Sequence, residues 1–401
     1  MSLFDKFEKI VAGRQALADR GITSNVVMEK VISPTEAVIN GRRMILAGTN
    51  NYLGLTFDPD CIEAASTAVR EQGTGTTGSR MANGTYSDHV QLEQELADFF
   101  GCKYGMVFST GYIANLAMLS ALTGPGDILL IDADSHASIY DGCRLSGAEI
   151  IRFRHNDPGD LEKRLKRLGD RAPNTLIIVE GIYSMLGDRA PLAAIAAVKA
   201  KYGAYLLVDE AHSLGVLGQR GRGLAEEAGV EEKVDFIVGT FSKSLGAIGG
   251  FCVSNQPGLD LIPFAARPYM FTASSSPSII ASTRAALHII STRRELSRKL
   301  WDNAHQLYEE LHNLGFQLGP EPSPVVAVRL ADIDQAIGLW RGLLERGVYV
   351  NLVTPPATPD GGCLLRCSVS AGHSTRQIEQ IINAFASLKE AVQVAETAQS
   401  L

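Results

Sequence analysis

Two stretches of sequence decide the fold of this chain: YLLVDEAHSLG at 205–215 and DFIVGTFSKSLGAIGGFCVS at 235–254. Each contains an apolar run of strand length that passes directly into charged, hydroxyl and glycine residues. We predict strands at 204–209, 236–239 and 250–254. The polar residues after the first two strands are then the first place to look for chemistry.

The same pattern extends over residues 59–253, where apolar runs alternate with segments of helical periodicity. The other predicted strands are 105–108, 128–131, 149–153 and 175–180, and the helices between them include 88–100, 111–122, 161–168 and 191–202. Strand–helix alternation over this length predicts an α/β domain with a mainly parallel sheet flanked by helices.

A second, smaller set of elements follows the large domain. We predict a long helical stretch at 277–314, then a strand at 325–330, a helix at 332–346, a strand at 364–369 and a final helix at 375–392. At the other end, residues 5–20 have an amphipathic helical pattern, followed by strands at 36–39 and 43–46. The predicted division is an N-terminal helix with short strands (1–55), a large domain (56–285) and a small α+β C-terminal domain (286–401).

Composition excludes several classes of protein. The chain has 401 residues, 37 basic and 44 acidic, which gives a net charge of −7, and 45% of its residues are hydrophobic. This composition is globular and rules out disorder, and the acidic balance argues against a nucleic-acid partner. Glycine is in excess, with 39 residues, and the surplus needs a structural reason.

The sequence also bears on compartment and metal binding. The first 21 residues lack the hydrophobic region of a signal peptide, and no stretch is apolar for the 18 or more residues of a spanning helix. The six cysteines are scattered without a metal-finger spacing, so we expect reduced thiols and no metal. These features predict a cytoplasmic protein, and loose attachment to the inner membrane surface through the N-terminal segment stays open.

One glycine pattern is a false lead. Gly73, Gly75 and Gly78 match G-x-G-x-x-G, but a dinucleotide fingerprint needs a strand before it and a helix after it. Here a helical pattern at 59–72 precedes the glycines and a polar loop follows them. We therefore do not expect a nucleotide site at this position.

The acidic residues after the strand at 204–209 are the first candidates for chemistry. Asp209, Glu210 and His212 follow the apolar run, and ligands of open α/β sheets bind beyond the carboxyl ends of the strands. Because side chains alternate along a strand, Asp209 and Glu210 cannot both face one site. A partly buried Asp209 needs a cation, although a helix cap or an ion pair is the alternative interpretation.

Lys243 is the second candidate, because it stands alone among small, apolar and hydroxyl residues. Partial burial would lower the pKa of its ammonium group and make the amine nucleophilic. Such a lysine can hold an aldehyde cofactor as a Schiff base. The alternative is a lysine that merely lines the start of a helix.

Two further segments complete a set of groups that suits pyridoxal phosphate. The segment FSTGY at 108–112 joins a strand to a helix, where backbone N–H groups and the helix dipole favour an anion such as phosphate. His136 follows another strand and could meet a planar ring. Lysine, acid, anion cradle and imidazole together predict pyridoxal 5'-phosphate as the cofactor, although each is ordinary by itself.

These residues resemble the α-oxoamine synthase family of fold-type I pyridoxal-phosphate enzymes, which have an aspartate-aminotransferase-like fold. The resemblance runs over nearly the whole chain, on the motifs NNYLGL (50–55), DADSHASIYDGCRLSGAEIIRFRHND (132–157), IYSMLGD (182–188), VDEAHSLG (208–215), GTFSKSLG (239–246), RPYMFTAS (267–274), PPATP (355–359) and LLRCSVSAGH (364–373).

The resemblance implies a cofactor role for several residues. Lys243 resembles the Schiff-base lysine, Asp209 would pair with the pyridinium nitrogen, and His212 would bond the phenolic oxygen with Ser184 nearby. His136 would stack on the ring.

The remaining assignments concern the phosphate and the substrate. The phosphate would be held by the Gly111 and Tyr112 amides, Thr240, Ser242 and, from a second subunit, Ser274. Arg366 resembles the clamp for the substrate carboxylate. Asn51 would lie near the amino acid, and Asn50 is a further candidate.

Within the family, the motifs look most like the members that condense L-serine with a long-chain acyl thioester. The implied products are 3-ketodihydrosphingosine, carbon dioxide and the free thiol of coenzyme A or acyl carrier protein, formed by a homodimer with a shared active site. The alternative is an 8-amino-7-oxononanoate synthase or glycine C-acetyltransferase, which use alanine or glycine and more often have glycine or alanine where this chain has Ser242 and Ser244.

One departure and one rival bear on this expectation. Some serine-using relatives have an arginine directly before PPATP, where this chain has Thr354, so Arg366 would act alone on the carboxylate. A non-catalytic partner on the same fold would lack the lysine, which this chain keeps. The glycines at 111, 181, 239, 246, 249 and 250 fall at or near the turns around the expected cofactor, where the backbone bends sharply or approaches a ligand.

Overall fold

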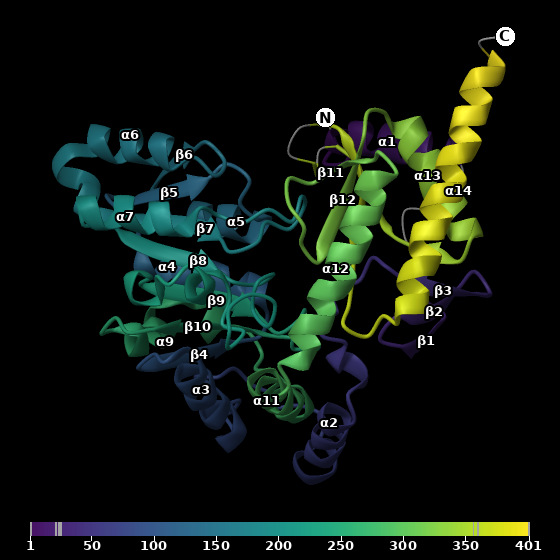
Figure 1. Cartoon of the computed structure of the whole chain (residues 1–401). Coiled ribbons are helices and arrows are strands. Elements are labelled where there is room, and N and C mark those ends of the chain that lie inside the picture. Colours follow the sequence, from purple (N-terminus) through teal and green to yellow (C-terminus); the bar gives the residue numbers. More distant parts are fainter. Residues whose placement is uncertain (1, 21, 23–25, 356, 359–360, 400–401) are drawn as a thin grey trace.

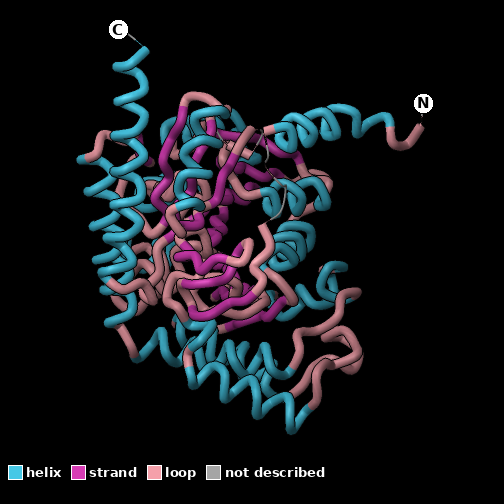
Figure 2. Tube along the Cα trace, turned by 90° about the vertical axis from the view of Figure 1, so that its right-hand side faces the viewer, coloured by secondary structure: helices cyan, strands magenta, loops and turns pink. Residues whose placement is uncertain are grey.

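The computed structural model describes residues 2–20, 22, 26–355, 357–358 and 361–399 (Figure 1). A large α/β region and a smaller C-terminal region lie side by side, with the packed helices α2 (Pro59–Gln72) and α11 (Pro277–Thr292) along one side of both. Helix α1 (Glu8–Asp19) and the end of α14 (Thr375–Gln399) lie at the same end of the molecule, and α14 projects from it (Figure 2).

A seven-stranded sheet forms the centre of the large region. Its strands, in spatial order, are β4 (Tyr104–Phe108), β10 (Gly250–Ser254), β9 (Phe236–Thr240), β8 (Tyr205–Asp209), β7 (Thr175–Glu180), β5 (Ile128–Asp132) and β6 (Glu149–Phe153). Within this sheet β10 runs antiparallel to both neighbours, and the remaining pairs are parallel. The mainly parallel α/β sheet predicted from the sequence is therefore confirmed.

Helices cover both faces of this sheet, which is why the interior positions of its central strands are apolar on both faces, as in residues 176–179 of β7 and 206–208 of β8. In β5, Leu129 and Ile131 pack into one core with residues of α4 and α5. Ile128 and Leu130 point the other way and join a second core that includes residues of α6 and α7. The covering helices include α3 (Ser87–Phe100), α4 (Gly111–Leu122), α5 (Ala137–Ser146), α6 (Pro158–Leu168) and α7 (Leu192–Tyr202), with short helices α8 (Leu224–Glu227), α9 (Ile262–Ala265) and α10 (Arg267–Met270) in the connections.

The C-terminal region has its own four-stranded sheet. Its strands, in spatial order, are β11 (Gln317–Leu318), β12 (Val325–Leu330), β15 (Cys363–Ser368) and β14 (Asn351–Val353), and its helices are α12 (Glu295–Asn313), α13 (Ile333–Glu345) and α14. A third sheet joins the two ends of the chain: β1 (Lys30–Ser33), β2 (Glu36–Ile39), β3 (Arg42–Leu46) and β13 (Val348–Tyr349). The division of the chain at residues 55 and 285 stays a proposal.

The helical stretch predicted over 277–314 is wrong as a single helix. The structure has two helices, α11 and α12, with a break at Arg293 and Arg294. Arg293 Nη1 donates to the Asp58 carboxylate at 2.7 Å, and Arg294 Nη2 donates to the Gly218 carbonyl at 2.9 Å. Helix α11 packs against α2, whereas α12 packs against α14. The break between them is therefore determined by tertiary contacts, and no glycine or proline in the sequence marks it.

Two other sequence observations can be placed on the fold. The G-x-G-x-x-G glycines directly follow helix α2, which is the wrong context for a dinucleotide site. Among the helices of the described residues, none combines the length and the apolar character that crossing a bilayer requires.

Candidate active site

A cavity of about 330 Å³ lies where the carboxyl ends of β5, β7, β8 and β9 meet. Eight of the twelve predicted site residues line it. They are Gly111, Tyr112, His136, Asp209, His212, Thr240, Ser242 and Lys243, joined by Thr110, Asn115, Ser138, Glu180, Ala211, Gly239, Ile248 and Gly249. The cavity therefore collects residues that are as much as 139 positions apart in the sequence.

Lys243 lies in the connection from β9 to β10 and is half-buried. Burial lowers the pKa of its ammonium group to about 8, although the charges of Asp209 and Glu180 act in the opposite direction. Within the described part of the chain, its side chain makes no hydrogen bond or ion pair. About a tenth of this amine is thus neutral and nucleophilic at pH 7, and about half at pH 8.

Asp209 ends β8 and is 6% exposed. Its Oδ2 accepts from Asn115 Nδ2 at 2.8 Å, and its Oδ1 accepts from the Ala211 amide at 2.9 Å. Glu210 points elsewhere and accepts from the Leu224 and Ala225 amides. The alternation expected at this strand end is present, and only Asp209 faces the cavity.

A chain of hydrogen bonds links Asp209 to His136. Asn115 Nδ2 also donates to Ser138 Oγ at 3.0 Å, and Ser138 Oγ lies 2.8 Å from His136 Nδ1. The Ser138 amide donates to the same Nδ1 at 3.2 Å, so this nitrogen acts as an acceptor. Burial lowers the pKa of His136, and the neutral ring carries its proton on Nε2.

Glu180 is a cavity residue that the sequence reasoning missed. It ends the buried strand TLIIVE, and its Oε1 accepts from the His136 amide at 2.5 Å. Burial and the neighbouring charge of Asp209 raise its pKa well above the ordinary value. The signal was available, because a carboxylate at the end of an apolar run is the same pattern that singled out Asp209.

His212 is buried and contacts Tyr52, another residue that sequence reasoning missed. The Tyr52 hydroxyl lies 2.7 Å from His212 Nδ1. Burial lowers the pKa of His212 well below its ordinary value, and the charges of Lys243 and Arg366 act in the same direction. A neutral imidazole that accepts from Tyr52 at Nδ1 has an Nε2–H left to donate.

The start of α4 forms one wall of the cavity. The Thr110 side chain caps the helix by accepting from the Ile113 amide at 3.1 Å, and the first-turn amides of Gly111 and Tyr112 remain available to an anion. A Cβ on Gly111 would lie 2.7 Å from the Cβ of Thr240. Thr240 Oγ1 in turn lies 2.9 Å from Ser242 Oγ, so two hydroxyls face the same helix end.

Arg366, Asn51, Ser184 and Ser274 do not line the cavity. Arg366 Nε donates to the Ser184 carbonyl at 2.6 Å, so Ser184 meets the arginine through its backbone. Asn51 Nδ2 donates to Thr56 at 2.7 Å.

The partners of the buried Arg366 side chain include Asn50. Arg366 Nη1 donates to Asn50 Oδ1 at 3.0 Å and to Ser368 Oγ at 2.8 Å. The structure thus brings Asn50, rather than Asn51, to the predicted carboxylate clamp.

Ser274 lies near His89 and away from the cavity of its own chain. Its hydroxyl is 2.8 Å from His89 Nε2, and its amide donates to the Gly78 carbonyl at 2.9 Å. A role at a phosphate would have to be played in another copy of the chain.

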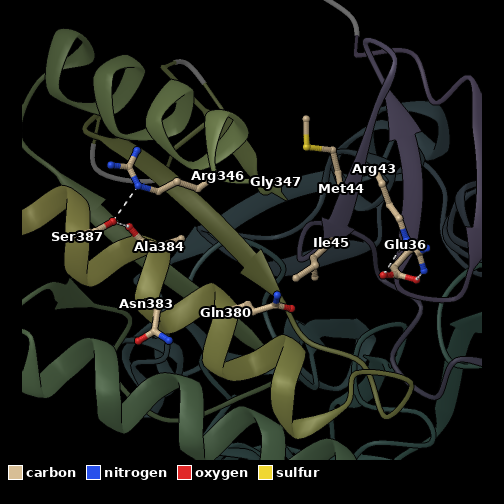
Figure 3. Close-up of a pocket in the computed structure, with 10 residues that line it drawn as sticks. All are labelled: Glu36, Arg43, Met44, Ile45, Arg346, Gly347, Gln380, Asn383, Ala384 and Ser387. Atoms are coloured by element: carbon tan, nitrogen blue, oxygen red, sulfur yellow. Dashed lines mark hydrogen bonds and ion pairs between the residues drawn. The ribbon is translucent and has the colours of Figure 1, made fainter.

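A second, more open groove of about 500 Å³ lies between β2, β3 and α14 (Figure 3). Its charged side chains are already engaged: Arg43 pairs with Glu36 at 2.5 Å, and Arg346 Nε donates to Ser387 at 2.8 Å. Among the described residues that line it, none is a nucleophile with a shifted pKa. The chemistry of the molecule is therefore concentrated at the end of the large sheet.

The sheet, the strand-end cavity and its lysine define an enzyme of the aminotransferase type. The chain belongs to the aminotransferase class I and II family, which matches residues 42–385.

More specific relatives narrow this class and confirm the resemblance of the motifs. The serine palmitoyltransferase of Caulobacter vibrioides (strain NA1000 / CB15N) is 58% identical over 397 residues, 99% of this chain and 98% of that protein. A high-resolution structure of serine palmitoyltransferase (SPT) with pyridoxal phosphate (PLP) matches this chain with a TM-score of 0.96 and 51% identity, over 98% of this chain and 100% of that one. The 8-amino-7-oxononanoate synthase of Lysinibacillus sphaericus is more distant, 36% identical over 92% of this chain and 95% of that protein.

Proposed function

We propose that this protein is a pyridoxal-phosphate-dependent acyltransferase that condenses L-serine with a long-chain acyl thioester of the palmitoyl-CoA type. The products are 3-ketodihydrosphingosine, carbon dioxide and a free thiol, which makes this the first step of sphingolipid synthesis. The observation that carries the proposal is Lys243, a half-buried amine with a pKa of about 8 that faces Asp209 across a strand-end cavity.

The donor set of the cavity fits pyridoxal phosphate. Lys243 supplies an amine for the aldehyde, and Asp209 supplies a buried carboxylate for the ring nitrogen. The Gly111 and Tyr112 amides with Thr240 and Ser242 offer N–H and O–H donors to the phosphate. A Cβ at Gly111 would fill space between these donors, which supports a close approach of the backbone to a ligand.

The two histidines are suited to contacts with the ring. Neutral His212 would donate from Nε2 to the phenolic oxygen, because Tyr52 occupies Nδ1. Neutral His136, tied to Asp209 through Asn115 and Ser138, would lie against the ring face. When bound, the protonated ring withdraws electrons from the Cα of the amino acid.

The chain's own groups then handle the substrate. Arg366 supplies the positive charge for the serine carboxylate, with Asn50 and the Ser184 carbonyl fixing its orientation. Lys243 Nζ takes the Cα proton as general base, for which a pKa near the working pH is suited. The new C–C bond forms between Cα and the thioester carbonyl as the thiol leaves. The carboxylate then departs as carbon dioxide, and Cα takes back a proton in its place.

Serine is favoured over alanine or glycine by the comparisons and by the residues beside the lysine. Identity is 58% to a serine palmitoyltransferase but 36% to an 8-amino-7-oxononanoate synthase. Ser242 and Ser244 flank Lys243, as in the serine-using members. Thr354 directly follows β14, which pairs with the strand that carries Arg366, so the single arginine carries the carboxylate charge.

The test is product analysis with purified protein and added pyridoxal phosphate. Serine, alanine and glycine are each incubated with palmitoyl-CoA and with palmitoyl-acyl carrier protein, and products are identified by mass. We expect 3-ketodihydrosphingosine with serine. Product only with alanine or glycine would favour the alternative enzymes, and no visible absorbance with added cofactor would favour a non-catalytic partner.

We also propose a cytoplasmic homodimer in which Ser274 of the partner subunit completes the phosphate site. Support comes from Ser274 lying outside its own chain's cavity and from two exposed apolar side chains. Phe271, three residues before Ser274, is 73% exposed, and Ile248, which lines the cavity, is 56% exposed. Sedimentation of the holoenzyme tests the dimer. Mixing Lys243→Ala and Ser274→Ala chains tests whether the active site is shared between subunits. In a hybrid dimer, one site would combine the intact Lys243 of one chain with the intact Ser274 of the other, so activity would be regained.

A further inference from the structure

A buried charge cluster lies beside the active site without lining its cavity. His155, just after β6, places Nδ1 2.7 Å from Asp132 Oδ1 and Nε2 2.7 Å from Asp188 Oδ2. The side chains of Asp132 and Asp188 are 0% and 8% exposed, and that of His155 is 25% exposed. The Asp134 carboxylate lies 3.8 Å from Nδ1, and the Tyr183 ring packs edge-on at 4.5 Å between centroids.

The geometry fixes the charge of this imidazole. Each ring nitrogen lies at hydrogen-bond distance from a carboxylate oxygen, so both nitrogens carry protons and the ring is an imidazolium. The two attached carboxylates raise the pKa of His155 to about 10, although burial acts to lower it. A metal ion has no room in contacts of 2.7 Å, so the cluster is an ion triad and not a metal site.

The triad joins two segments that serve the active site. Asp132 ends β5 and begins the turn that carries His136. Asp188 belongs to the loop 181–190, which is closed by an Ile182–Arg189 bridge and by the Tyr183 amide donating to the Asp188 carbonyl. This loop also presents the Ser184 carbonyl that accepts from Arg366 Nε at 2.6 Å.

Asn156 reinforces the same junction. Its backbone N–H donates to Asp132 Oδ2 at 2.9 Å. Its side-chain Nδ2 donates to Asp188 Oδ2 at 2.8 Å and to the Arg189 carbonyl at 3.0 Å. It has a φ of +51°, which asparagine tolerates better than most residues. The chain therefore bends at this point so that consecutive residues, His155 and Asn156, hold the same two carboxylates.

We propose that His155 is a positioning residue for amino-acid binding: through Asp188 it holds the loop 181–190 so that the Ser184 carbonyl aligns Arg366. The proposal rests on the proposed function, because it takes Arg366 as the clamp for the substrate carboxylate. His155 does not line the cavity and acts on the amino-acid site through the loop.

The experiment compares holoenzymes of the wild type, His155→Gln and Asp188→Asn, with His288→Gln, an exposed histidine on α11, as the matched control. Amino-acid dissociation constants come from spectrophotometric titration with serine, alanine and glycine, and cofactor dissociation constants from titration of the apoproteins. Hydrogen exchange of peptides covering 181–190 reports on the loop. Asp188→Asn removes one ion pair and keeps Asp132, so it remains informative if His155→Gln folds poorly.

We expect the amino-acid dissociation constant to rise at least about fivefold in both variants, as a coupling between sites would give, with cofactor affinity unchanged and faster exchange in the loop. The effect should shrink in an Arg366→Lys background, because residues that act through one another are not additive. An unchanged amino-acid affinity, an additive effect with Arg366→Lys, or an equal loss of cofactor affinity would overturn the proposal. A wild type that binds alanine or glycine but not serine would instead contradict the proposed substrate. The affinities of the wild type and the His155→Gln variant would then be compared with the amino acid that does bind.

Discussion

Replacing His155 by glutamine should remove a pH-dependent part of the protein's stability. The pKa of this imidazole is about 10 in the folded chain against an ordinary value of 6.5. The native state thus keeps a proton that the unfolded state releases, and the stabilisation is complete below pH 6.5 and lost as pH rises through 10. A pKa shift of this size corresponds to about 4 kcal/mol at pH 7 and about 1 kcal/mol at pH 9.

The magnitude agrees with the burial of the triad. Asp132 and Asp188 stay buried when the imidazolium is removed, and breaking a buried ion pair costs about 3–5 kcal/mol. Glutamine can donate to one carboxylate but brings no charge, so it cannot compensate both.

The assay is urea unfolding of the wild type, His155→Gln and the control His288→Gln at equal cofactor loading between pH 7 and 10.5. The wild type should lose stability relative to His155→Gln by about 1.4 kcal/mol per pH unit over the middle of this range. The two curves should converge near pH 10.5, whereas the control should follow the wild type. A gap between wild type and His155→Gln that stays constant with pH would refute the argument, because it would mean that the imidazole stabilises by packing and not by charge.

Three further outcomes are expected at the cavity. Lys243→Ala should abolish both the visible absorbance of bound cofactor and turnover, and borohydride reduction of the wild type should label the peptide containing Lys243 and no other. The rate of cofactor capture should rise with pH toward about 8 and then level, since the Lys243 amine becomes neutral there; stopped-flow absorbance that is flat from pH 6.5 to 9 would contradict this. Gly111→Ala should lower the free energy of unfolding by about 1–3 kcal/mol through overpacking and weaken cofactor binding, because its Cβ would lie 2.7 Å from the Cβ of Thr240. The control is Gly338→Ala on α13, where the new Cβ meets open space. It should be neutral or stabilising in the same unfolding and titration assays.

Residues at strand ends were the part of the site that the sequence could predict. Lys243, Asp209 and His136 each follow an apolar run, and parallel strands bring their carboxyl ends to one edge. Asn115 was missed because it lies within the apolar helix α4, where only its contact with Asp209 shows its use. Tyr52 was missed because its partner His212 is 160 residues away, and no local pattern encodes such a contact.

The fold shows the same division between local and distant information. The bounds of β7 and β10 were predictable from their apolar runs, because both strands are buried along their whole length. The break between α11 and α12 was not, because Arg293 and Arg294 end one helix and begin the next through contacts with Asp58 and Gly218. Likewise, Asn50 and Asn51 are adjacent in sequence, and only the tertiary structure decides which one meets Arg366.

The antiparallel strand β10 has a consequence for the order in which the site assembles. It pairs directly with β9, with Gly250 opposite Thr240, so Lys243 is carried on a hairpin whose contacts close over few residues. The Arg366 clamp instead depends on partners 182 and 316 residues away. Local contacts form faster than distant ones during folding. We therefore expect the hairpin that carries Lys243 to form earlier in refolding than the contacts of the Arg366 clamp.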